Sequence, residues 1–199
     1  MSSEPRSQST PQSRILSAAS AVFAERGFNG GSLTDIATGA EMTRPGVLHH
    51  YPSKQAVLLA LLDRRDQELQ QLLPDTASWD LVEFLEYFER ASVVILSNRE
   101  LVQLAHALTA EAAAPDHPAR PWVVKRHRRL RADFVRAIEN SKRVGTVPAE
   151  FDSAALAGAM LGAIEGIENQ WLVDREFDAA AAIRMHIQLV LQAVARKRK

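Results

Sequence analysis

Two helix start signals stand close together in this sequence, at Ser32 and Thr43. Ser32 is followed three residues later by Asp35, the spacing of a capping box, in which the hydroxyl accepts a hydrogen bond from an unpaired backbone N–H. Thr43 is followed by Arg44 and Pro45, and proline is tolerated in a first helical turn because its missing N–H would have no partner there. Since only eleven residues separate the two caps, the stretch predicts a helix-turn-helix.

The rest of the chain has the apolar spacing of helices, and no segment alternates as a strand would. One helix capped by Ser13 is expected before the motif and six after it, so the predicted fold is all-α with about nine helices. The six are expected at Lys54 to about Leu73, Trp79–Ser97, Arg99–Ala113, Trp122–Val144, Ser153–Leu172, and from a cap at Asp178 to the basic residues Arg196–Lys199.

Composition narrows the class of protein. Hydrophobic residues make up 46% of the chain and charged residues 24%, which is ordinary for a soluble globular protein. The absence of cysteine excludes disulfides and thiolate metal sites and favours the cytoplasm. Residues 1–12 lack the apolar core of a signal peptide and are expected to form a disordered arm. The longest nonpolar run, Ala154–Ile164, is too short to cross a bilayer, so no membrane partner is expected.

From about Arg14 to Leu62 the chain resembles the N-terminal domain of the TetR family of bacterial transcription regulators. The motifs that carry the resemblance are Gly27-Phe28, Leu33-Thr34-Asp35-Ile36-Ala37, the short helix Arg44–His50, Tyr51 and Lys54. Three positions depart from the family pattern: Glu41-Met42 replaces Gly-Val in the turn, Pro45 replaces a glycine, and Leu48 replaces a tyrosine that commonly touches phosphate.

The resemblance implies a ligand-responsive repressor that binds a palindromic DNA operator. Residues 13–72 would be the DNA-binding domain and residues 73–199 a regulatory, ligand-binding and dimerisation domain. Arg44 and His49 are the candidates for base edges, and Thr34, Tyr51 and Lys54 for the DNA backbone. The full set of expected DNA-binding residues is Thr34, Thr43, Arg44, Pro45, Gly46, His49, His50, Tyr51 and Lys54.

The helix expected at Ser153–Leu172 has no polar face. Glycines spaced by four form a stripe opposite its larger apolar side chains, and each interior glycine costs about 0.8–1 kcal/mol relative to alanine. Either the helix is buried within its own monomer, or one face packs on a second copy, as the resemblance implies. The second reading predicts a homodimer interface that contains Gly158, Gly162, Gly166, Ile183, Ile187 and Val190. The run Glu165–Leu172 also resembles the BetI-like branch of the family.

The remaining candidate residues concern a small-molecule effector whose identity the sequence does not reveal. In TetR-like folds the effector cavity lies between the fifth, sixth, seventh and eighth helices. The resemblance therefore implies the pocket residues Phe84, Phe88, His106, His127, Phe134 and Trp171. No metal or cofactor is expected, because adjacent His49 and His50 diverge by about 100° on a helix and chelate poorly. No nucleophile–base pattern or phosphate loop is found, so an enzyme is not expected.

Charge provides the main argument against DNA binding. Residues 1–72 contain seven Lys/Arg and seven Asp/Glu, whereas DNA-binding domains are commonly basic. The alternative is therefore a helix-turn-helix protein that serves mainly as a protein-interaction module and has lost DNA binding.

Overall fold

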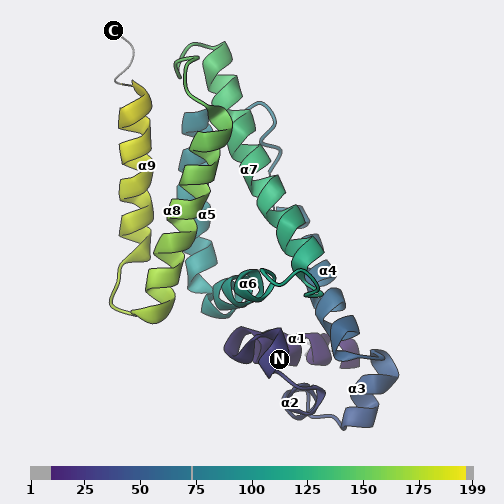
Figure 1. The fold of residues 1–199 in the computed structure, drawn as a ribbon. Helices are drawn as coiled ribbons and strands as arrows, with labels where there is room; N and C mark the ends of the chain where they lie inside the picture. Colours follow the sequence, from purple (N-terminus) through teal and green to yellow (C-terminus); the bar gives the residue numbers. More distant parts are fainter. Residues whose placement is uncertain (1–9, 73, 196–199) are drawn as a thin grey trace, which may run out of the picture. The chain divides into compact units, whose positions relative to one another are not determined.

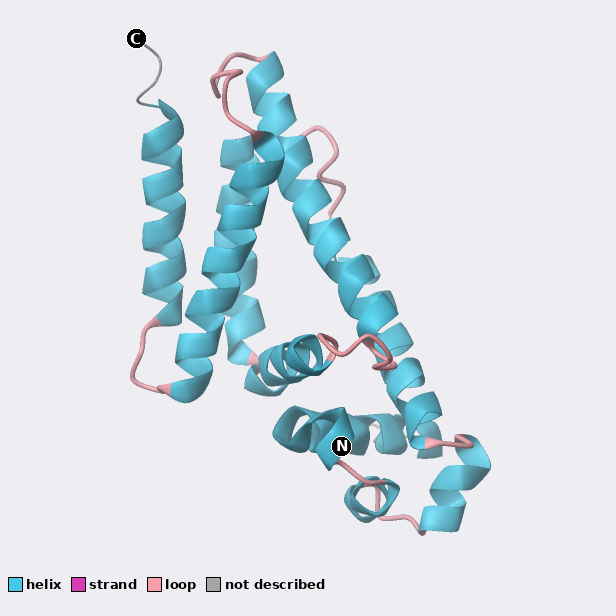
Figure 2. Cartoon of the chain, viewed as in Figure 1, coloured by secondary structure: helices cyan, strands magenta, loops and turns pink. Residues whose placement is uncertain are grey.

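The structure, a computed structural model, describes residues 10–72 and 74–195, and the regular elements of this part of the chain are all helices (Figures 1 and 2). The all-α prediction is thus confirmed. The helices are α1 (Pro11–Gly30), α2 (Leu33–Gly39), α3 (Arg44–His50), α4 (Lys54–Leu72), α5 (Leu81–Ser97), α6 (Arg99–Glu111), α7 (Arg120–Arg143), α8 (Ser153–Val173) and α9 (Ala179–Ala195).

The first helix begins earlier than the sequence pattern predicted. Its N-cap is Thr10, whose hydroxyl accepts a hydrogen bond from the Ser13 amide at 3.1 Å, so Ser13 lies inside the first turn and does not cap it. Pro11 follows the cap, where a proline fits the start of a helix. The predicted arm is therefore wrong for residues 10–12, and its residues 1–9 lie outside the described chain, as does the basic segment 196–199.

The other start signals behave as local hydrogen-bonding rules require. The predicted caps are confirmed at Ser32, Thr43 and Asp178, each of which accepts a hydrogen bond from a backbone amide three residues later. Ser53 caps α4 in the same way. The fifth helix starts at Leu81 and not at the predicted Trp79, because Asp80 and Glu83 form a capping box.

The described chain divides into two compact units. We call the first the N-terminal unit; it contains the described residues up to Leu72 together with Gln103–Arg120, a segment that the sequence had placed in the regulatory domain. In this unit α1 packs on α2 and α4. Its core contains the fully buried side chains of Ile15, Phe23, Ile36, Val47, Val57, Leu58, Leu104 and Leu108.

The C-terminal unit contains the described parts of Leu73–Val102 and Pro121–Lys199. Here α9 packs along both α5 and α8, and α8 and α9 run side by side (Figure 1). The core is assembled from the inward stripes of four helices and includes Leu85, Phe134, Ile138, Met160, Ile164 and Ile183. None of the helices in the described ranges is long and apolar enough to span a membrane.

Candidate nucleic-acid interface

The turn between α2 and α3 is a Schellman-type helix end. The Met42 amide donates to the Ala37 carbonyl at 2.9 Å, and the Glu41 amide donates to the Thr38 carbonyl at 3.1 Å. This geometry requires a left-handed residue, and Glu41 supplies it with φ 55°, the only positive φ of a non-glycine residue in the described chain. The position is the one at which the family pattern commonly has glycine, so Glu41 holds the turn at some conformational cost.

Helix α3 packs on the core through one buried side chain and exposes a largely polar surface. Val47 is fully buried, whereas Thr43, Arg44, Pro45 and His49 are exposed. Arg44 forms no hydrogen bond or ion pair with any residue that the structure describes. Its guanidinium is therefore available to a ligand outside the chain. Guanidinium groups pair readily with guanine edges and phosphates.

The two histidines of α3 lie together at its C-terminal end. Their rings meet edge to face with centroids 5.3 Å apart, and His50 is half-buried while His49 is exposed. The Tyr51 amide donates to the Val47 carbonyl at 2.9 Å and thereby closes the helix. Of the predicted pair, His49 is the side chain that faces outward.

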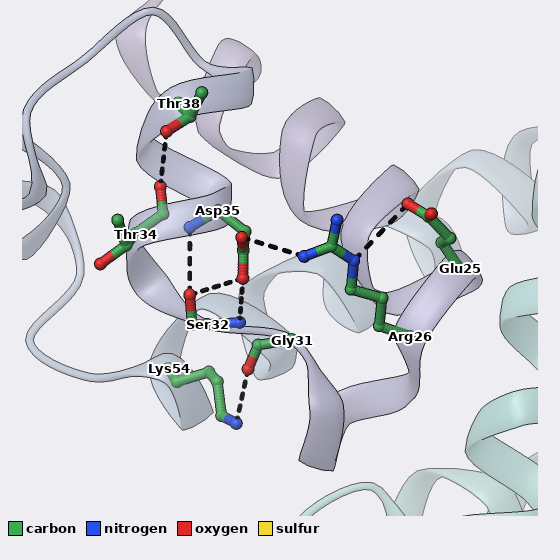
Figure 3. A network of polar contacts seen from close by, with 8 residues as sticks. All are labelled: Glu25, Arg26, Gly31, Ser32, Thr34, Asp35, Thr38 and Lys54. Carbon is green, nitrogen blue, oxygen red and sulfur yellow. Dashed lines mark hydrogen bonds and ion pairs between the residues drawn. The ribbon is translucent and has the colours of Figure 1, made fainter.

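A polar network holds α2 against the end of α1, as Figure 3 shows. The capping box is complete, because the Asp35 amide donates to the Ser32 hydroxyl at 3.1 Å and the Ser32 amide donates to Asp35 at 3.0 Å. Arg26 of α1 donates to the other oxygen of Asp35 at 3.0 Å and also lies 3.7 Å from Glu25. Thr34 is exposed beside this network, with its carbonyl accepting from Thr38 at 3.0 Å.

The Asp35 carboxyl is electrostatically favoured in its charged form. The hydrogen bond from the Ser32 hydroxyl, 2.5 Å long, is the largest cause that holds the pKa of Asp35 below its ordinary value. Partial desolvation opposes this, and the Ser32 amide and the Arg26 guanidinium reinforce it. The start of α2 is thus stabilised by an ionised aspartate.

Lys54 occupies a different environment from the one expected of a phosphate contact. Its amino group donates to the carbonyl oxygens of Phe28 at 2.7 Å and Gly31 at 2.9 Å, and it lies 4.5 Å from the centre of the Phe28 ring. These contacts, one of which is drawn in Figure 3, join the start of α4 to the end of α1. Lys54 therefore supports the motif from within the N-terminal unit.

The comparisons with known proteins agree with this geometry. The family model described as bacterial regulatory proteins of the tetR family matches residues 15–61, which run from within α1 to the first half of α4. The HTH-type transcriptional repressor BepR of Brucella suis is 26% identical over 188 residues, 90% of each chain. The regulator EthR of Mycobacterium tuberculosis is 40% identical over 70 residues, about a third of each chain. Residues 15–61 of the present chain thus carry the helix-turn-helix domain of the TetR family.

Solved structures show the same TetR fold over nearly the whole chain. SmeT, the repressor of the Stenotrophomonas maltophilia multidrug efflux pump SmeDEF, superposes with a TM-score of 0.70 at 20% identity and covers 94% of this chain and 90% of its own. A putative regulator from Saccharomonospora viridis in complex with choline gives 0.72 at 22%, covering 93% and 97%. Together with the match of residues 15–61 and the similarity to BepR, this fold makes the chain a helix-turn-helix transcriptional regulator.

Most of the residues expected to line an effector pocket have structural partners within the described chain. Phe84, Phe88 and Phe134 form one aromatic cluster, with ring centroids 5.0–6.5 Å apart, and Phe134 is fully buried. These three side chains belong to the core of the C-terminal unit. A surface hollow of this unit is lined by residues the sequence had not indicated: Asn169, Gln170, Val173, Asp174 and Phe177.

The other three candidates are polar or partly polar sites. The Nε2 atom of His127 lies 2.9 Å from a carboxylate oxygen of Glu165, which links α7 to α8. The Arg99 guanidinium lies 5.0 Å from the Trp171 ring centre and donates to the Trp171 carbonyl at 3.2 Å, at the C-terminal end of α8. His106 is half-buried in α6.

The residues expected at a dimer interface fall into two groups. A Cβ added to Gly158, Gly162 or Gly166 would meet no atom within 4 Å, so the glycine stripe of α8 is not buried within the described chain. Ile183 and Ile187, in contrast, are buried in the core of their own unit, and Val190 packs against it. The large apolar side chains that α9 exposes are instead Met185 and Leu189, an i, i+4 pair that is not among the predicted interface residues.

Proposed function

We propose that this regulator represses transcription by inserting α3 into the major groove of a pseudo-palindromic operator. The observation that carries the proposal is the arrangement of Arg44 and His49, which are exposed on α3 while Val47 anchors the helix in the core. A helix-turn-helix reads base edges with the second of its two helices, and phosphate contacts set its position.

Each exposed residue has a role in this docking. Arg44 and His49 would read base edges, and the Pro45 and Gly46 backbone would lie close to the groove. The hydroxyl groups of Thr34, Thr43 and Tyr51 would contact the DNA backbone. His50 would contribute its partly exposed edge, and Lys54 would hold α4 in place from behind the reading surface, because its amino group is taken up by backbone carbonyl oxygens.

The direct test is a fluorescence-anisotropy titration with DNA from upstream of the protein's own coding region. Tight binding to one fragment, at least a thousandfold stronger than to unrelated DNA, is the range expected of a specific regulator. Equal affinity for both fragments would refute specific recognition at this site.

We further infer that the functional species is a homodimer formed through α8 and α9. The glycine stripe of α8 leaves room for the close approach of another helix, and Met185 and Leu189 add apolar surface on α9. A symmetric dimer presents its two reading helices to two half-sites, which is why the operator should be pseudo-palindromic.

The effector is proposed to be a small, largely apolar compound that binds the C-terminal unit. Relatives support a ligand response, since SmeT is described as the repressor of a multidrug efflux pump and the Saccharomonospora regulator was solved with choline. Helix α4 has no internal glycine or proline, so it should move as a rod and tilt α3 when a ligand binds. Half-sites on DNA are spaced by about 34–36 Å per turn, and a small tilt of the two reading helices would penalise binding.

Thermodynamic linkage provides the test of regulation. Allosteric coupling is typically about 1–3 kcal/mol, and operator DNA must weaken ligand binding by the same factor by which ligand weakens DNA binding. A compound that raises the melting temperature should therefore be titrated with and without operator. Equal ligand affinities in the two titrations would show that the bound compound does not regulate.

One observation favours a second function. The charges of residues 1–72 balance, seven against seven, so a protein-interaction module without DNA binding remains the alternative. The same anisotropy titration separates the two, because a module of this kind would bind no fragment at low salt.

A further inference from the structure

The last residue of α6 reaches the end of α1. One carboxylate oxygen of Glu111 accepts a hydrogen bond from the Phe28 amide at 2.7 Å, and the other accepts from the Asn29 amide at 3.1 Å. Phe28 and Asn29 are more than 80 residues away in sequence, and nothing in the local pattern around them indicates such a partner. Backbone N–H groups paired with a carboxylate make charge-assisted hydrogen bonds, which are stronger than neutral ones.

The chain is shaped at Gly27 to admit this carboxylate. Gly27 interrupts α1 with φ 70° and ψ 175°, a conformation that side chains disfavour. A Cβ at this position would lie 2.4 Å from a Glu111 oxygen and 2.9 Å from its carboxyl carbon, so the carboxylate fills the space that a side chain would need. Glycine is thus required at position 27 for two reasons: the backbone has a positive φ at the kink, and Glu111 approaches too closely for a side chain.

The segment after α6 packs beside Glu111 and against Phe28. His117 is buried, with 6% of its surface exposed, and its ring meets Phe28 edge to face at 5.3 Å. Its Nδ1 accepts from the Ala119 amide at 3.2 Å, while its Nε2 lies 3.4 Å from Glu111. Arg120 closes the end of α6 by donating to the Ala112 and Ala113 carbonyls at 2.8 and 3.1 Å.

The same corner of α1 supports the reading motif on its other side. Residues 27–31, which we call the α1 corner, provide the carbonyl oxygens that bind Lys54 at the start of α4. The corner is followed directly by Ser32, the cap of α2. Helices α2 and α4 flank α3 in the sequence, so the position of the corner determines how α3 is presented.

We propose that Glu111 is a positioning residue for DNA recognition, which holds the α1 corner so that α2 and α4 present α3 in the geometry of the operator. It touches no DNA itself. The inference rests on the operator binding proposed above, and it extends the recognition machinery to a residue outside the helix-turn-helix and outside residues 15–61. Without the carboxylate, two amides lose their acceptor and the corner relaxes.

The expected effects differ from those of a DNA contact. Glu111→Ala should lower operator affinity about tenfold, which corresponds to about 1.4 kcal/mol. Affinity for unrelated DNA, and the slope of affinity against salt concentration, should not change, because no phosphate contact is removed. Glu111→Gln, which retains one acceptor oxygen, should give an intermediate loss. Glu100→Ala, an exposed carboxylate at the other end of α6, is the matched control and should bind as the wild type does.

The experiment combines anisotropy titrations on operator and unrelated DNA with amide hydrogen exchange of the full-length protein. In Glu111→Ala the Phe28 and Asn29 amides should exchange faster, while the Tyr51 amide, bonded to Val47 at 2.9 Å, serves as the internal reference. If Glu111→Ala does not fold, Glu111→Gln carries the test.

Two results would overturn the proposal. One is faster exchange at both amides with unchanged operator affinity. The other is a parallel loss of affinity for operator and unrelated DNA that follows the folded fraction, as expected of a residue needed only for stability. If the wild type bound no DNA fragment, the proposed function itself would fail, and that outcome is distinguishable from the first two.

Discussion

The amino group of Lys54 lies 2.7 Å from the carbonyl oxygen of Phe28 and 4.5 Å from the centre of its ring. A lysine at the start of α4 was expected to contact phosphate, but here its donors bind carbonyl oxygens of the α1 corner. Replacing it by methionine keeps the aliphatic stem and removes the charge, so Lys54→Met separates the two roles.

For Lys54→Met we expect a loss of stability of roughly 1.5–3 kcal/mol, the usual range for hydrogen bonds to a charged group. Chemical denaturation measures this loss. If Lys54 contacted phosphate instead, stability would be nearly unchanged and the salt slope of operator binding would fall by about one.

Arg44→Ala should weaken operator binding by about 1–3 kcal/mol and relax specificity at one base pair, because a base-edge contact is lost. The Arg44 guanidinium is exposed and has no partner among the described residues. Anisotropy titrations on operators with single base-pair changes measure both effects. Arg90→Ala, an exposed arginine of α5, controls for net charge. Equal affinity of Arg44→Ala and wild type would contradict the docking of α3.

Gly162→Glu should give a folded monomer. The added side chain meets nothing within 4 Å in its own chain, and replacing a helical glycine should not destabilise the monomer. At a dimer interface, however, two buried glutamates would face each other without partners. Light scattering after gel filtration measures the mass, and circular dichroism confirms folding. Ala132→Glu, at an exposed position of α7, is the control. The dimer proposal fails if Gly162→Glu and wild type have the same dimeric mass, or if the wild type is monomeric at micromolar concentration.

Glu41→Gly should stabilise the protein by about 1 kcal/mol, since Glu41 adopts φ 55° in the α2–α3 turn and a left-handed conformation costs about 1–2 kcal/mol for a residue with a Cβ. Urea denaturation provides the measurement. Glu41→Ala removes the charge but keeps the Cβ, so it should show no such gain. A gain of the same size in both variants would mean that charge, and not backbone strain, is responsible.

The start of α2 should lose stability in acid. The pKa of Asp35 is lower in the folded chain than the ordinary value of about 3.9, so its ionisation stabilises the folded state above that value. The contribution disappears as pH falls from there through the folded pKa. Ser32→Ala removes the largest cause of the shift, and a carboxyl NMR titration should then place Asp35 closer to its ordinary pKa. An unchanged titration in Ser32→Ala would contradict the assigned cause.

The sequence by itself determined the helix-turn-helix and the all-α class. Ser32, Asp35 and Thr43 could be recognised because caps bond to amides only two or three residues away, and apolar spacing identifies which segments are helices. The cap at Thr10 was not predicted, because both Thr10 and Ser13 are hydroxyl residues that can cap a helix. The local sequence therefore does not decide between them.

Only the tertiary structure decided which of the candidate side chains are exposed and so available to a binding partner. Ile183 and Met185 lie two positions apart on an apolar helix, yet the first is buried in the core and the second is exposed, because packing against α5 and α8 selects one face. Glu111 could not be found from sequence at all. Its partners are backbone amides, which every residue possesses, so no residue type near Phe28 signals a contact that exists only after α6 has packed beside the kink at Gly27.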